Sequence, residues 1–329
     1  MRPPPEGPPA GRETADAGDG RLPDLLLVGA PRCGTTSLHH YLGGHPQVFM
    51  TPVKEPRFFS AQVFSYPGAG PGDERVRPVR TLEEYRRLTA GAGDARVVGE
   101  ASPENLYWHR QVIPRIRQTL GQPRILILLR DPVERAFSAW CMRVRERREA
   151  LSFEQALAQE EARLAAGWDP SWAYLGGSLY AAQVASYLES FGQVHVALYE
   201  DLVGVPAREL RRILEFLAVD ADAAPDRLPR LNVSGRLRSP AVNRWFVDTG
   251  SRLHAWARRL GRATLGERGW VVLREATRAR TLAPASLPRG LHAPLAAALR
   301  DDVERLQGIL GRDLSAWLRR PPRTARQRG

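Results

Sequence analysis

Residues 29–38 combine glycine, hydroxyl and arginine side chains in a pattern typical of an anion-binding loop. The stretch reads GAPRCGTTSL and follows the short apolar run Leu25–Val28. Glycines let the backbone turn tightly, so that successive N–H groups face a bound phosphate. A helix that begins after the loop adds its positive end. The hydroxyl residues after Gly34 can donate hydrogen bonds, and Arg32 can supply charge. A plain strand-to-helix turn with a threonine cap is the alternative interpretation.

The spacing of this loop is close to that of the nucleotide-triphosphate loop G-x-x-x-x-G-K-[ST]. Gly29 and Gly34 fit the pattern, but Thr35 stands where that motif has lysine. A kinase or NTPase would lose the charge that reaches the β- and γ-phosphates. The loop therefore favours a phosphate group whose cation comes earlier in the chain, from Arg32.

A second candidate phosphate site follows the apolar run Ile125–Leu129, where the sequence is RDPVERAFSAW. Pro132 suits the first turn of a helix. Arg130 stands at the carboxyl end of a strand, where open α/β sheets bind ligands. Ser138 lies about two turns into that helix. An arginine and a serine that converge on one spot suit a phosphate; alternatively, the arginine caps the strand and the serine faces solvent.

The charge balance of the chain favours anionic partners. Among 329 residues, 48 lysines and arginines stand against 36 acidic residues, a surplus of 12. Such a surplus suits a nucleotide, a phosphorylated metabolite, an acidic glycan or nucleic acid. Lys54 is the single lysine. Two cysteines, Cys33 and Cys141, exclude a disulfide scaffold, and no Cys/His cluster suggests a metal site.

The two ends of the chain are predicted to be disordered, with one domain between them. Residues 1–21 are rich in Pro, Gly and Asp and lack the apolar stretch of a signal peptide. Residues 22–318 form the predicted domain, and residues 319–329 form a basic tail. No apolar run approaches the roughly 18 residues that span a bilayer. We therefore expect a cytoplasmic protein without a transmembrane segment.

Apolar runs predict strands, and helical periodicity predicts the helices between them. The predicted strands are 25–28, 96–100, 124–129 and 194–199, and a first helix begins at Ser37. Further predicted helices are 81–90, 109–120, 133–147, 152–166, 179–191, 206–218, 240–262 and 292–312. This alternation predicts a single P-loop-like, three-layer α/β domain with a central, mainly parallel sheet flanked by helices.

Together, the two phosphate motifs resemble the nucleotide-binding elements of the sulfotransferases that use 3′-phosphoadenosine 5′-phosphosulfate. The resemblance is closest to the heparan-sulfate and other carbohydrate sulfotransferases and their bacterial relatives. Further segments that are similar to that family are KEPRFF at 54–59, GEASPENLY at 99–107, GSLY at 177–180, NVSGR at 232–236 and RDLSAW at 312–317. The resemblance covers about residues 22–318.

The resemblance implies roles for particular residues. The first loop would hold the 5′-phosphosulfate, Arg130 and Ser138 the 3′-phosphate, and the late loop 232–236 would close over the adenosine side. The implied nucleotide-binding residues are Arg32, Cys33, Gly34, Thr35, Thr36, Ser37, Arg130, Ser138, Tyr180, Ser234, Gly235 and Arg236. Arg32 replaces a lysine of many members, as in the protein-tyrosine branch. Ala101 replaces a lysine that the heparan-sulfate enzymes have near the acceptor, which leaves the acceptor class open.

Sulfuryl transfer needs a base for the acceptor hydroxyl and positive charge for the transferring and leaving groups. The resemblance implies that Glu55 is the base and that Arg32 stabilises the bridging oxygen and the leaving 5′-phosphate. Lys54, as the only lysine, would neutralise sulfonate charge or position the nucleotide. Glu100 is either a second acid near the acceptor or a buried strand-end residue bonded to backbone. No metal is implied.

The expected activity is direct transfer from this nucleotide to a hydroxyl, less readily an amine, of a glycan, a glycolipid or a natural product. Two alternatives stay open. One is a P-loop kinase or NTPase. The other is a non-catalytic protein that binds polyanions through the arginine-rich stretch 274–280 and the C-terminal tail. We expect no specific nucleic-acid partner.

Overall fold

A computed structural model of the chain describes residues 20–223 and 290–319, with isolated positions between them at 236–237, 259, 264, 282–283 and 287–288. The predicted lead before residue 20, the predicted helix 240–262 apart from residue 259, and the tail beyond residue 319 lie outside the described residues.

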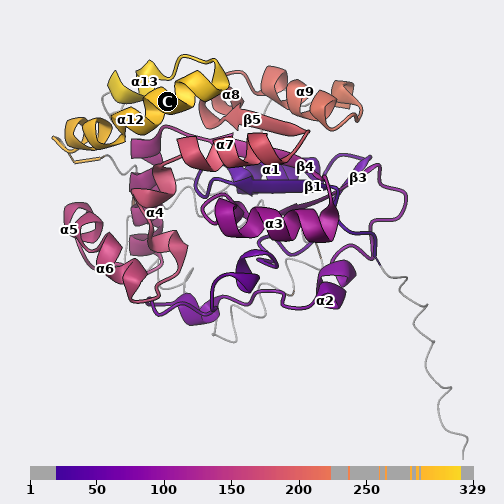
Figure 1. The fold of residues 1–329 in the computed structure, drawn as a ribbon, viewed down its shortest axis with the longest axis horizontal. Helices are drawn as coiled ribbons and strands as arrows, with labels where there is room; N and C mark the ends of the chain where they lie inside the picture. The colour runs from indigo at the N-terminus through magenta and orange to yellow at the C-terminus, as the bar shows by residue number, and fades with distance from the viewer. Residues whose placement is uncertain are drawn as a thin grey trace, which may run out of the picture.

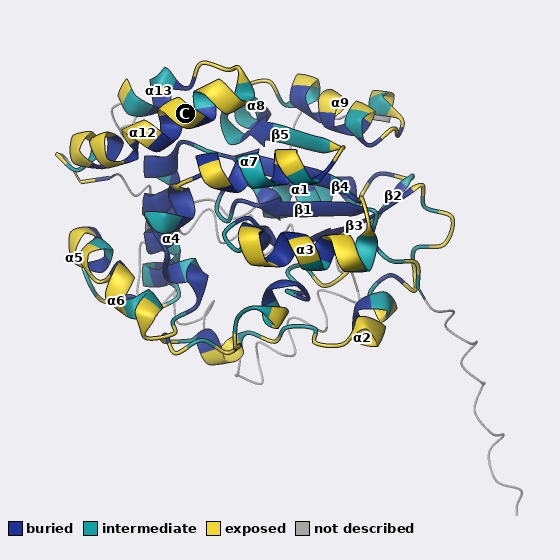
Figure 2. Ribbon diagram, in the orientation of Figure 1, coloured by how far each residue is buried: buried dark blue, intermediate teal, exposed yellow. Residues whose placement is uncertain are grey.

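Five parallel strands form the central sheet, in the order β2–β3–β1–β4–β5 (Figure 1). Their bounds are β1 Leu25–Gly29, β2 Val48–Met50, β3 Val97–Ala101, β4 Arg124–Leu129 and β5 Val194–Leu198. The inner strands are buried along almost their whole length (Figure 2), as parallel strands are when helices cover both faces of the sheet. The predicted α/β fold is confirmed. β2 was not predicted, because three residues carry no periodic signal.

Helices cover both faces of this sheet. α3 (His109–Leu120) and α7 (Ala181–Ser190) lie side by side over one face (Figure 1). The connection from β1 to β2 leads toward one edge of the sheet, and that from β3 to β4 leads toward the other. Since such crossovers are right-handed, α1 (Thr35–Leu42) covers the opposite face, where it contacts β1, β2 and β3.

The remaining elements surround this core. Their bounds are α2 Leu82–Arg87, α4 Pro132–Arg145, α5 Phe153–Ala158, α6 Glu160–Ala165, α8 Tyr199–Gly204, α9 Pro206–Phe216, α12 His292–Leu310 and α13 Ser315–Arg319, with β6 Arg236–Leu237 paired to β7 Leu282–Ala283. The helix predicted over 152–166 is divided into α5 and α6 at Gln159, which caps both.

Local sequence explains how the helices next to the site begin. The Asp131 side chain accepts hydrogen bonds from the N–H groups of Val133 (3.0 Å) and Glu134 (3.2 Å), and Pro132 fills the first position of α4. α1 begins differently: its N-cap is Gly34, which offers no side-chain acceptor. The first N–H groups of α1 are therefore not capped by that residue, as suits a helix end that meets an anion.

The C-terminal helix α12 is fastened to the domain by one buried carboxylate. Asp302 accepts hydrogen bonds from the N–H groups of Tyr180 (2.7 Å) and Ala181 (3.2 Å), which begin α7. The side chain thus caps a helix that lies more than a hundred residues away in the chain. This contact holds the segment around Tyr180 in place from outside the sheet.

We expect Asp302→Ala to lower the free energy of unfolding by about 1–3 kcal/mol, because two buried N–H groups lose their acceptor. The matched control is Asp301→Ala, an exposed position on the same helix, where we expect a change within about 0.5 kcal/mol. Urea unfolding followed by tryptophan fluorescence measures both. Equal effects of the two substitutions would contradict the capping role of Asp302.

Candidate active site

The candidate site lies at the carboxyl ends of β1 and β4, which are neighbours in the sheet. The N–H of Ala30 donates to the carbonyl of Leu128 at 2.6 Å, which ties the start of the first loop to β4. The chain leaves β1 toward one face of the sheet and passes from β3 to β4 on the other, so the loops at this edge diverge and form a crevice. The two motifs found in the sequence therefore meet at one place.

The loop after β1 has the backbone geometry that its glycines suggest. Gly34 has φ +95°, and a Cβ atom there would lie 3.0 Å from the ring of Tyr199, so only glycine fits. Arg32 also has a left-handed φ of +73°, a conformation that costs energy in a non-glycine residue and is enriched at functional sites. The left-handed backbone at Arg32 and Gly34 therefore sets the path of the loop at the carboxyl ends of β1 and β4.

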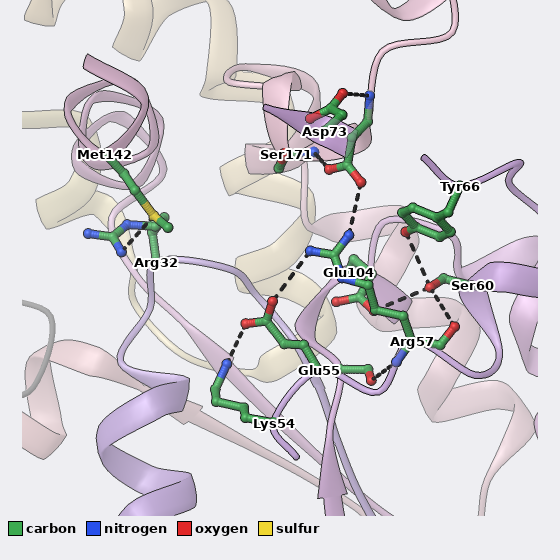
Figure 3. A network of polar contacts seen from close by, with 12 residues as sticks. Arg32, Lys54, Glu55, Arg57, Ser60, Tyr66, Asp73, Glu104, Met142 and Ser171 are labelled. Carbon is green, nitrogen blue, oxygen red and sulfur yellow. Dashed lines mark hydrogen bonds and ion pairs between the residues drawn. The ribbon is translucent and has the colours of Figure 1, made fainter. Parts of the chain in front are cut away.

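The two predicted phosphate motifs are in direct contact through Arg32. Its Nε donates to Oγ of Ser138 at 3.2 Å. Its Nη1 donates to Sδ of Met142 at 3.2 Å (Figure 3). Arg130 donates from Nη1 to the carbonyl of Arg32 at 3.5 Å, and its guanidinium lies 5.0 Å from the centre of the Tyr199 ring. Arg130 also pairs with Glu134 at 2.9 Å.

Positive charge is concentrated around Arg32. Burial, and then the charges of Arg145 and Arg130, lower the pKa of Arg32 to about 9 against the opposing effect of Glu146. The side chain stays protonated at neutral pH, yet the shift shows that cations are held close together. Nearby, Nε of Arg143 is buried and meets no hydrogen-bond partner among the described residues. An anion bound here would relieve this repulsion.

On the other side of the site, residues 54–57 form a strained loop. This loop follows β2 in the chain and lies against the carboxyl end of β3. Glu55 and Arg57 both have left-handed backbones, with φ of 60° and 59°. The N–H of Glu55 donates to the carbonyl of Ala101 at 2.9 Å, and the N–H of Arg57 donates to Oγ of Ser102 at 3.1 Å. These bonds hold the two strained residues and present their side chains to the site.

The side chains of this loop form a chain of ion pairs with Glu55 in the middle. Lys54 Nζ lies 2.5 Å from one carboxylate oxygen of Glu55, and Arg57 lies 3.4 Å from the other (Figure 3). Arg57 also pairs with Asp169 at 2.9 Å. Burial alone would raise the pKa of Glu55, but the charges of Lys54 and Arg57 outweigh it and lower the pKa to about 2. Glu55 is therefore ionised at neutral pH.

Two further carboxyl groups lie behind this loop. Glu100 is 1% exposed and accepts a hydrogen bond from Oγ of Ser102 at 2.8 Å, a side-chain partner rather than the backbone. Burial raises the pKa of Glu100 to about 8. Glu104 accepts a hydrogen bond from Oγ of Ser60 at 3.2 Å, and burial raises its pKa to about 7. Both groups titrate near neutral pH, unlike Glu55.

A cavity of about 280 Å³ lies between the two loops. Of the residues predicted from the sequence, Arg32, Thr35, Thr36 and Glu55 line it. Cys33 and Tyr180 are fully buried behind the first loop, with 3.9 Å between Sγ and the hydroxyl. Ser234 and Gly235 lie outside the described residues, and only the backbone of Arg236 is described, in β6.

The cavity is also lined by functional candidates to which the sequence alone assigned no role. These are Arg57, Glu104, Arg143, Arg148 and Asp169. Arg57 and Glu104 stand within the KEPRFF and GEASPENLY segments, so those motifs contained a signal. Asp169 offered none, because it is separated from its partner Arg57 by 112 residues.

A parallel sheet with an anion-binding loop after its central strand, and an arginine and serine after the neighbouring strand, defines a P-loop-like α/β protein. Residues 23–223 match the model of the Sulfotransferase family. The chain belongs to this family, as the motifs predicted.

Several known proteins are similar to the chain. Heparan sulfate glucosamine 3-O-sulfotransferase 3A1 of Mus musculus is 29% identical over 206 residues, which is 62% of this chain and 48% of the relative. Carbohydrate sulfotransferase 15 of Homo sapiens is 25% identical over 170 residues, covering 42% of this chain and 30% of the relative. The chain spans at most about half the length of these two curated relatives.

A solved sulfotransferase from Alicyclobacillus acidocaldarius is similar over nearly all of both chains. Its TM-score is 0.70 at 34% identity, and the match covers 91% of this chain and 100% of that one. Within the described part of the chain, no helix has the length and apolar character to cross a membrane. The same residues contain no group of three or more His, Cys, Asp or Glu side chains arranged to hold a metal ion.

The raised pKa of Glu100 predicts how the free energy of unfolding changes with pH. Between its ordinary value of 4.5 and about 8, the folded protein holds a proton on Glu100 that the unfolded chain has lost. The contribution of this group to stability therefore falls as the pH rises through that interval. Glu100→Gln removes the effect, so the variant should gain stability relative to the parent on going from pH 5 to pH 8.

Urea unfolding at pH 5, 6.5 and 8 measures this difference. Glu154→Gln, at an exposed position on α5, is the control and should follow the parent at each pH. Parallel curves for Glu100→Gln and the parent would show that Glu100 is ionised in the folded protein throughout this interval.

Proposed function

We propose that the protein transfers a sulfuryl group from 3′-phosphoadenosine 5′-phosphosulfate to an acceptor hydroxyl. The observation that carries the proposal is the contact between Arg32 and Ser138, with Arg130 beside them. These contacts bring Ser138 and Arg130 next to the loop after β1, which supports a second anion site there. A nucleotide with anionic groups at both its 3′ and 5′ positions requires two such adjacent sites.

The donor groups fit the two ends of this nucleotide. The backbone and hydroxyls of Gly34, Thr35, Thr36 and Ser37 suit the 5′ end at the start of α1. Arg130 and Ser138 suit the 3′-phosphate, since a guanidinium can bind phosphate through two hydrogen bonds. Tyr180 and Cys33 would support the loop from behind, and the late loop with Ser234, Gly235 and Arg236 would close over the adenosine side.

The residues that line the cavity would carry out an in-line transfer. The acceptor oxygen forms a bond to sulfur while the bond from sulfur to the 5′-phosphate oxygen breaks, and the acceptor proton passes to Glu55. Glu55 is ionised for this task because Lys54 and Arg57 hold its pKa low. Arg32 and Lys54 would stabilise the charge on the transferring group and the leaving phosphate. The scheme uses no metal ion.

Glu100 is a second candidate base, and a specific observation favours it. A general base works best when its pKa is near the operating pH, and the pKa of Glu100 is about 8 whereas that of Glu55 is about 2. Glu55 faces the cavity, however, and Glu100 lies buried behind Ser102. The position in the cavity therefore supports Glu55 as the base, whereas the pKa supports Glu100.

The acceptor is proposed to be a hydroxyl of a sugar, a glycolipid or a natural product. The names of the similar proteins, which include heparan sulfate and carbohydrate sulfotransferases, support a sugar.

A cytoplasmic location is part of the proposal, and cell fractionation would test it. The kinase alternative is weakened by Thr35, which leaves the loop without the lysine of NTPases.

The first test is calorimetric titration with adenosine 3′,5′-bisphosphate and with ADP, both without magnesium. We expect tight binding of the bisphosphate and weak binding of ADP, because only the bisphosphate fills both anion sites. Preference for ADP, or binding of neither compound, would contradict the proposed function.

Arg130→Ala should weaken binding of the bisphosphate by about 10- to 100-fold, since it removes a charge-assisted hydrogen bond of about 1.5–3 kcal/mol. The affinity for ADP, which has no 3′-phosphate, should fall much less in the same variant. Arg110→Ala, at an exposed position on α3, is the control for the loss of one positive charge. Equal affinity of the two variants for the bisphosphate would contradict the assignment of Arg130 to the 3′-phosphate.

Substitution of the two carboxylates decides which one is the base. Glu55→Gln should lower kcat by roughly 10²–10⁴-fold while the bisphosphate still binds. With Glu55 as base, kcat should stay level from pH 6 to pH 9, because this group is already ionised. If kcat instead rises through pH 8 and Glu100→Gln abolishes the rise, Glu100 is the base.

A further inference from the structure

We infer that the acceptor is a compact, uncharged hydroxyl compound with an apolar face, rather than a polyanionic glycan. The inference rests on the proposed function and specifies its acceptor. It comes from the charges, the shape and the lining of the cavity between the two loops.

The arginine nearest Glu55 is already neutralised within the protein. Arg57 lies 2.9 Å from Asp169 and 3.4 Å from Glu55, and its side chain is only 13% exposed. Glu104 adds a third carboxyl group beside it. An anionic acceptor would have to displace one of these carboxylates to gain the charge of Arg57. Arg57 therefore offers little attraction to a sulfate or carboxylate group.

Two arginines on the opposite wall, Arg143 and Arg148, also have carboxylate partners, although Nε of Arg143 is left without a hydrogen bond among the described residues. Arg143 lies 2.7 Å from Glu146, and Arg148 lies 3.4 Å from the same carboxylate and also pairs with Asp73. Arg135 donates to Oγ of Ser178 at 2.8 Å and to backbone carbonyls of the 173–174 segment. Of the arginines in the described part of the lining, Arg32 remains, and the proposed function assigns it to the nucleotide.

Carboxylates would oppose an anionic acceptor. Glu55, Glu146 and Asp169 all line the cavity, and the sulfuryl group to be transferred is itself negative. Like charges brought together in a buried site cost several kcal/mol. Among the described lining residues, carboxylates therefore oppose the positive charge on the acceptor side of the cavity.

The described lining also includes apolar residues beside the polar Thr35, Thr36, Ser171 and Gln183, and the space is small. The apolar lining residues are Val76, Pro103, Tyr107, Ala139, Met142 and Pro170. The volume of about 280 Å³ must also hold the sulfuryl group, and pockets for drug-sized molecules start at roughly 300 Å³. The cavity thus suits a compact acceptor, with its hydroxyl toward Glu55 and its apolar face on the opposite side.

The test compares two acceptors of equal size, phenyl β-D-glucopyranoside and phenyl β-D-glucopyranosiduronic acid, which differ in one carboxylate. Transfer from the labelled nucleotide and binding to bisphosphate-saturated protein are measured for both. We expect the glucoside to have at least a tenfold higher kcat/KM. Its KM should change less than twofold between 0.05 and 0.5 M NaCl.

A matched variant tests the cause of the preference. Glu146→Gln removes the shared partner of Arg143 and Arg148, so binding of the glucuronide to the bisphosphate-saturated protein should improve several-fold while glucoside binding stays the same. Glu154→Gln on the exposed face of α5 is the control and should change neither.

Three outcomes would overturn the inference. They are equal or better transfer to the glucuronide, transfer to a heparan sulfate tetrasaccharide with a KM that rises steeply with salt, and binding of neither phenyl glycoside at 10 mM. In each case the bisphosphate titration on the same preparation separates the two proposals. Normal bisphosphate binding means that only the acceptor class is wrong, whereas its loss means that the proposed function fails.

Discussion

The parallel pairing of β1 with β4 is the constraint on which the site depends. The strands lie side by side although 94 residues separate the end of β1 at Gly29 from the start of β4 at Arg124, and their carboxyl ends open at the same edge. The loop after β1 and the start of α4 therefore face each other across one crevice. Arg32 reaches Ser138 only because of this pairing. Every further contact of the nucleotide side is built on that juxtaposition.

Charge is distributed unevenly between the two sides of the crevice. Around Arg32, guanidinium groups stand close together, and their repulsion lowers the pKa of Arg32. Around Arg57, each positive charge meets a carboxylate within the protein. The first arrangement favours an incoming anion, and the second does not. The same fold thus brings a cluster of positive charge next to a cluster that is nearly balanced in charge.

The wall of the cavity around Asp169 has little regular structure, and a buried carboxylate holds it together. Asp73 is fully buried and accepts hydrogen bonds from the N–H groups of Gly70 (3.0 Å) and Asp169 (3.1 Å) and from the indole of Trp172 (3.2 Å). Arg148 pairs with the same carboxylate. The segment around residues 70–73 is thereby fixed to the 168–172 segment. This arrangement keeps Asp169 in reach of Arg57.

The sequence by itself determined the strands β1, β3, β4 and β5, the helices next to them and the two phosphate motifs. Those features depend on residues close together in the chain: apolar runs, helical periodicity, and the glycines and prolines that end them. Only the tertiary structure decided the contact of Arg32 with Ser138, the pair Arg57–Asp169 and the high pKa of Glu100. Each depends on burial and on partners brought together by folding, which no local pattern encodes. The charge balance of the cavity has the same origin.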